Sequence, residues 1–150
     1  MGHFLYDETH WPFCVTTAEG AISLEQHLEM LAAWDRWFDK QEPFIVFRHH
    51  LDKAALEQAD GAAKATKAWL QAGARDQIKT QVRAMCILVP PDAMATVPKS
   101  SVEKVFGIPG GVFHDFAQVF DWLDHRAWFN CSSVNQDRFR QTYLRQHRSD

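Results

Sequence analysis

The stretch FIVFRHH, residues Phe44 to His50, decides the fold class of this 150-residue chain. Its first four residues are all apolar, and Pro43 separates them from the helical pattern that precedes them. A short, continuous apolar run is typical of a strand that helices bury on both faces. The stretch therefore predicts a central strand in a sheet that is covered by helices.

Three further stretches predict strands around this one. Residues 12–18 alternate Phe13 and Val15 with polar or small neighbours, and Val112-Phe113 follows a glycine pair. Residues 85–89 form a second continuous apolar run. Two prolines, which cannot donate to a strand ladder, follow that run and end it.

Helical patterns lie between the predicted strands. Ser23 and Gln26 form a capping-box pattern, which predicts that a helix starts there. Asp115 stands where a carboxylate would cap the helix of residues 116–123. The first helix places Leu24, Leu28, Leu31 and Phe38 on one predicted buried face. The other helices are predicted at 56–70 with Gly73 as the C-cap, at 75–81, at 98–106 with Pro98 in the first position, and at 135–146.

The alternation of strands and helices indicates an α/β layer fold with a partly parallel sheet. The length suits one domain, residues 1–150, with a core at about 10–125 and a C-terminal extension at about 126–150 that adds a helix.

This order of elements resembles the STAS fold, in particular its SpoIIAA-like branch, which is often grouped with the SEC14-like lipid-binding fold. The resemblance is carried by PFCVTTAEGAIS (12–23), EPFIVFRHH (42–50), AWLQAGARDQIKTQVRAMCILV (68–89) and FGIPGGVFHDFAQVFDWL (106–123). It implies four to five mostly parallel strands covered by helices, and a regulatory or accessory interaction protein. STAS antagonists carry a phosphorylated serine in an Asp-Ser-Ser-Gly-type motif, whereas the matching RHHLDKAALEQADG (48–61) has no serine. We therefore expect no serine phosphorylation switch.

Charge and composition exclude some classes of protein. A net charge of −3 argues against a nucleic-acid partner, which would require a basic face. No apolar run approaches the roughly 20 residues of a transmembrane segment. Asp7 and Glu8 lie where a secretory signal would be basic and then apolar. The three cysteines form no CxxC motif, so we expect a cytoplasmic protein.

Candidate site residues follow two predicted strands: His49, His50 and Asp52 after the second, and His114 and Asp115 after the fourth. Ligands gather beyond the carboxyl ends of parallel strands, so these groups could form a metal site or an acid–base site if the two ends are neighbours. They could equally be loop residues and helix caps, and adjacent histidines in an extended chain point to opposite faces. We assign the five residues as ligand-binding candidates and expect no metal site.

Other reactive or exposed groups give weaker signals. Cys131, near a helix start, is the most plausible reactive thiol, but an inert thiol is the better interpretation for it as for Cys14 and Cys86. The tryptophans at positions 34, 37, 122 and 128 exceed the needs of a small core and favour a homodimer or a protein partner.

These observations together favour a non-enzymatic, STAS-like binding or interaction protein that requires no cofactor. The alternative is a small-molecule-binding or metal-binding accessory protein, or an enzyme, that uses the histidines at the strand ends.

Overall fold

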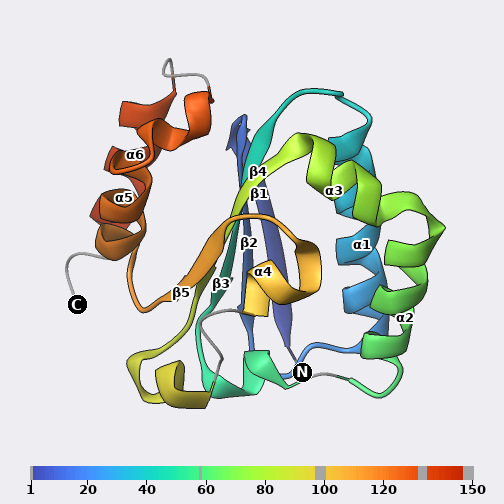
Figure 1. The fold of residues 1–150 in the computed structure, drawn as a ribbon. Coiled ribbons are helices and arrows are strands. Elements are labelled where there is room, and N and C mark those ends of the chain that lie inside the picture. The colour runs from blue at the N-terminus through green and yellow to red at the C-terminus, as the bar shows by residue number, and fades with distance from the viewer. Residues whose placement is uncertain (1, 58, 97–100, 132–134, 147–150) are drawn as a thin grey trace.

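The computed structural model describes residues 2–57, 59–96, 101–131 and 135–146, and these form an α/β fold (Figure 1). One sheet holds five strands in the order β1-β2-β3-β4-β5. β1 pairs antiparallel with β2, and the other neighbours pair in parallel. The strands are β1 (His3–His10), β2 (Phe13–Glu19), β3 (Phe44–His50), β4 (Val82–Leu88) and β5 (Gly110–Phe113).

Helices cover both faces of the sheet (Figure 1). The helices α1, α2 and α3 lie over one face, and α5 and α6 lie over the other. The α-helices are α1 (Leu24–Phe38), α2 (Ala62–Trp69), α3 (Arg75–Gln81), α4 (Ser101–Phe106), α5 (Phe116–Asp124) and α6 (Gln136–Gln146). Shorter helical turns are η1 (Lys53–Leu56), η2 (Leu70–Ala74), η3 (Pro91–Thr96) and η4 (Ala127–Asn130).

The central strand β3 confirms the interpretation of its apolar run. Phe44 and Val46 belong to the core beneath α1, whereas Ile45 and Phe47 belong to the core beneath α5 and α6. All four are fully buried. Successive side chains of a strand point to opposite faces, so each residue of this run packs against one of the two helix layers.

Two predicted helix caps are confirmed. The backbone N–H of Gln26 donates to Ser23 Oγ at 3.1 Å, and the Ser23 N–H donates to Gln26 Oε1 at 2.9 Å. The Asp115 carboxylate accepts from the Gln118 N–H at 2.8 Å and starts α5. The predicted apolar face of α5 is also buried.

The N-terminal strand and the face of α1 differ from the predictions. β1 was not predicted, because it is an edge strand whose mixed polar residues form no continuous apolar run. On α1, Leu24 and Leu28 are exposed, contrary to the predicted face. Leu31 and Phe38 are buried as predicted, and Trp34 and Trp37 lie in the buried stripe with them.

The region after β3 is also more broken than predicted. Residues 56–70 do not form one helix, because η1 ends at Leu56 and α2 begins only after Gly61, whose φ is +87°. Gly73 (φ +130°) has a non-helical backbone at the kink before α3, which agrees with its predicted place at a helix end. The predicted role of Pro98 lies outside the described residues.

Candidate functional site

The two histidines that end β3 point to opposite faces of the sheet, as an extended chain requires. The His49 ring lies edge-on to Phe116 of α5, with ring centroids 5.4 Å apart. The Nδ1 atom of His50 lies 3.3 Å from the Ala55 carbonyl oxygen, on the opposite face. The structure therefore does not bring these two imidazoles together.

Asp52 has a structural position beside them. Its carboxylate accepts hydrogen bonds from the Gly20 N–H at 3.1 and 3.2 Å and from the Ala55 N–H at 2.9 Å. These bonds cap η1 and tie it to the end of β2.

The second candidate pair lies at the far side of β4, which separates β3 from β5. His114 Nδ1 lies 3.3 Å from Asp115 Oδ2, and both side chains are exposed. The ends of β3 and β5 are therefore not direct neighbours. Within the described ranges, no group of three or more His, Cys, Asp or Glu side chains is arranged to hold a metal ion.

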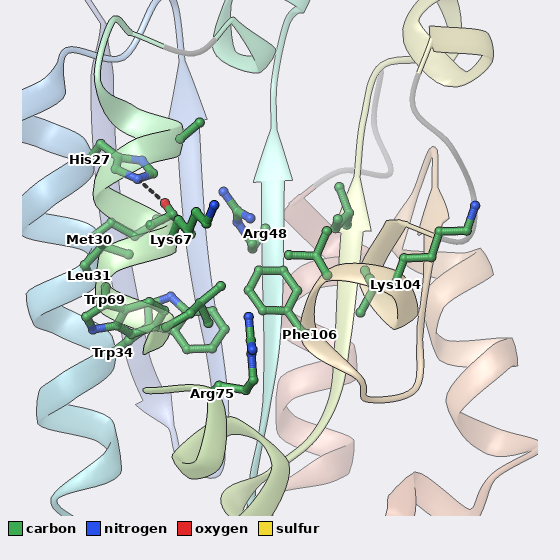
Figure 2. Close-up of a pocket in the computed structure, with 16 residues that line it drawn as sticks. His27, Met30, Leu31, Trp34, Arg48, Lys67, Trp69, Arg75, Lys104 and Phe106 are labelled. Carbon is green, nitrogen blue, oxygen red and sulfur yellow. Dashed lines mark hydrogen bonds between the residues drawn. The ribbon is translucent and has the colours of Figure 1, made fainter. Parts of the chain in front are cut away.

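A cavity of about 540 Å³ lies on the face of the sheet that α1 and α2 cover, and α4 also lines it (Figure 2). We call it the helix-side cavity. Its aromatic wall is formed by Trp34, Trp69 and Phe106. The rings of Trp34 and Trp69 are perpendicular, with centroids 5.9 Å apart, and Trp34 lies nearly parallel to Phe106 at 6.5 Å. The Trp69 Nε1–H donates to Asp35 Oδ1 at 2.9 Å, which fixes that ring.

Arg48 brings a cation to this cavity from the sheet. It continues the alternation of Phe44 and Val46, so its side chain leaves β3 on the face of α1. Its strand neighbours are Thr16 on β2 and Ile87 on β4.

The environment of Arg48 is unusual for a charged group. Its Nε atom is buried and has no hydrogen-bond partner among the described residues. Burial lowers the pKa of Arg48, but a guanidinium remains charged in proteins. The described lining of the helix-side cavity contains no Asp or Glu, and Glu57 lines a smaller cavity that Arg48 also borders.

Other polar groups lie around Arg48. The His27 Nε2 atom of α1 lies 2.7 Å from Thr66 Oγ1 of α2. Burial and the Arg48 charge lower the pKa of His27, which favours its neutral form. Figure 2 shows Lys67 pointing toward Arg48, and Arg75 extending toward Phe106 from the opposite side.

A smaller cavity of about 170 Å³ adjoins the first and shares His27, Met30, Arg48 and Ile87 with it. Its lining also includes His50. Burial and the charge of Arg48 lower the pKa of His50 to about 3, so its ring is neutral near neutral pH. Among the five sequence candidates, His50 borders this region, and the remaining four line neither of the two cavities.

The sequence analysis missed Arg48 and His27. The available signal was that Arg48 directly follows a fully buried apolar run and occupies the next position of its inward alternation. His27 lies one turn from the capping box, and its proximity to Arg48 comes only from the packing of α1 on the sheet.

The cysteines agree with the inert interpretation. All three are free thiols with buried side chains. Burial raises the pKa of the Cys131 thiol to about 11, and it also raises those of Cys14 and Cys86. A thiol with a raised pKa holds little of the nucleophilic thiolate at neutral pH.

No protein-family model, curated protein or solved structure matches this chain. In the described part of the chain, no helix has the length and apolar character needed to cross a membrane. The functional conclusion therefore rests on the geometry of the helix-side cavity.

Proposed function

We propose that this protein is a non-enzymatic binding protein that holds a small organic molecule in the helix-side cavity. The observation that carries the proposal is the cavity itself, whose volume of about 540 Å³ suits a small ligand and whose wall is aromatic. Ligand sites in proteins are typically roughly 300–1,000 Å³ in volume, with apolar walls and a few polar groups. The buried thiols support binding rather than nucleophilic catalysis.

The proposal includes a STAS-like, SpoIIAA-like organisation and a cytoplasmic location. The α/β order and the mostly parallel sheet support the first, and the free thiols support the second. The region of residues 48–61 has no serine, which supports a function without a serine phosphorylation switch.

We also propose that the chain forms a homodimer, but not through Trp34, Trp37 or Trp128. Trp34, Trp37 and Trp128 are each only 2% exposed and belong to the cores. What supports association is β1, an edge strand that pairs with β2 alone among the described strands. Its Leu5 side chain is 67% exposed. Open edge strands with apolar side chains are templates for pairing with another chain. Light scattering that returns a species of 17.3 kDa, the mass of one chain, would exclude this dimer.

The binding proposal is tested with N-phenyl-1-naphthylamine, a neutral dye that fluoresces in apolar sites. We expect saturable binding by the wild-type protein. Ala63→Phe should weaken it, because Ala63 lines the cavity from the exposed side of α2. Ala68→Phe is the matched control, since Ala68 is also exposed on α2 but is not part of the lining. Absence of dye binding, or equal weakening by both variants, would overturn the proposal.

A further inference from the structure

We infer that the helix-side cavity selects organic anions whose carboxylate or phosphate group pairs with Arg48 while an apolar body lies against the aromatic wall. This inference rests on the proposed function and names the chemical class of the ligand.

The first step is the Arg48 guanidinium on the sheet, whose Nε–H has no partner among the described residues. Arg48 lies where the alternation of β3 would otherwise place an apolar side chain, and its Nε–H is buried without a partner. Leaving a buried donor or charge unpaired is costly. An anion at this position would supply the missing acceptor, and a guanidinium presents a planar fork that matches a carboxylate or a phosphate.

The second step is the distribution of charge. The chain as a whole has 19 acidic and 16 basic residues, so cations are not in excess. The described lining of the cavity nevertheless contains four basic residues and no acidic one: Arg48, Lys67, Arg75 and Lys104. Lys67 points toward Arg48, whereas the Lys104 ammonium lies away from this group (Figure 2).

A second hollow on the molecule has the opposite character. It lies near the start of α1, and its described lining includes Glu25, Glu29 and Glu57 but no Lys or Arg. Acidic side chains gather at this hollow, whereas basic side chains line the helix-side cavity; Glu57 also lines the smaller cavity that Arg48 borders. The basic lining of the helix-side cavity favours an anionic ligand there, since opposite charges in a site set its preference.

The third step concerns two neutral groups that line the cavity, His27 and Trp34. The lowered pKa of His27 keeps its ring neutral near neutral pH, so Arg48 and Lys67 supply the positive charge there. The Trp34 Nε1–H, within the aromatic wall, is buried and has no partner among the described residues. A ligand that carries oxygen acceptors next to its apolar body would fit both features.

The test compares three ligands that share one ring system: 2-naphthoate, 2-naphthyl phosphate and the neutral 2-naphthol. Each is used to displace N-phenyl-1-naphthylamine from the wild-type protein. We expect at least one anion to displace the dye at a concentration about tenfold lower than 2-naphthol, as a charge-assisted hydrogen bond predicts. The better of the two anions identifies the head group.

Variants then assign the preference to Arg48. Arg48→Met should abolish the preference for the anions over 2-naphthol, measured against the dye affinity of that same variant, while Arg48→Lys should retain part of it. Arg83→Met is the matched control, because Arg83 is a partly buried arginine on β4 that does not line the cavity.

The outcomes separate the two proposals. Equal displacement by all three ligands overturns the anion inference and leaves the binding function standing, even if Arg48→Met fails to fold. A preference that survives in folded Arg48→Met also overturns it. Failure of the dye to bind the wild-type protein overturns the binding function and this inference with it.

Discussion

The His27 ring and the Thr66 hydroxyl lie 2.7 Å apart and connect α1 to α2 beside the helix-side cavity. Both residues line that cavity, so the bond fixes the relative position of two of its walls. Thr66 is also the first hydroxyl residue after the serine-free region of 48–61, and its half-buried oxygen already has a partner.

Thr66→Val is expected to lower the free energy of unfolding by about 1 kcal/mol, because it keeps the shape of the side chain but leaves His27 without its partner. Thr66→Ser is the control, since it retains the hydroxyl and should recover most of the loss. Urea denaturation measures both. Full stability of Thr66→Val together with a loss in Thr66→Ser would mean that the methyl group, and not the hydrogen bond, matters.

The fold was predictable where local pattern and tertiary burial agree. The run Phe44–Phe47 and the face of α5 are buried as predicted, because each has the period of its own element. β1 was not predictable in the same way, since an edge strand with exposed charges has no continuous apolar pattern.

The candidate site was less predictable than the fold. The opposite directions of His49 and His50 follow from strand geometry and were anticipated. The position of the partly buried Arg48 depends on α1, α2 and α4, which lie far apart along the chain and line one cavity with it. Spacing within one element contains no information about that arrangement.

The partly buried His50 predicts that acid destabilises the fold. Its pKa falls from the ordinary 6.5 to about 3 on folding, so between these values the unfolded chain binds a proton that the folded chain does not. Stability from this group is fully present above about pH 6.5 and is lost as the pH falls toward 3. The slope approaches about 1.4 kcal/mol per pH unit for one proton.

His50→Gln should reduce this dependence, because glutamine does not titrate and its amide can still donate to the Ala55 carbonyl. His114→Gln is the control, since His114 is exposed. The urea midpoint is measured near pH 7 and near pH 5. If the loss of stability between these conditions is the same in His50→Gln as in the wild type, His50 is not its source.

The turn η4 has an unusual backbone, because Ala127, Trp128, Phe129 and Asn130 all have positive φ. A left-handed conformation costs a non-glycine residue roughly 1–2 kcal/mol, and Ala127 (φ +49°) is exposed and free to be replaced.

Ala127→Gly is expected to leave the protein as stable as the wild type or to stabilise it by up to about 1 kcal/mol, after the greater freedom of glycine in the unfolded chain is subtracted. Ala68→Gly, at an exposed right-handed position of α2, should instead cost about 1 kcal/mol. Thermal unfolding compares the two. A loss in Ala127→Gly equal to that in Ala68→Gly would contradict the strained geometry.

The final prediction separates structure from chemistry at the His114–Asp115 step. Asp115 Oδ1 accepts from the Gln118 N–H, and the Gln118 side chain accepts from the His114 N–H, so the carboxylate caps α5. Asp115→Ala should therefore cost about 1 kcal/mol in urea denaturation, and Asp115→Asn less, because an amide oxygen still caps. His114→Ala should change stability by less than about 0.5 kcal/mol, since exposed ion pairs contribute little. It should also leave displacement of the dye by 2-naphthoate unchanged, because His114 does not line the helix-side cavity. Loss of that displacement in His114→Ala, with stability intact, would instead place the ligand at the strand ends.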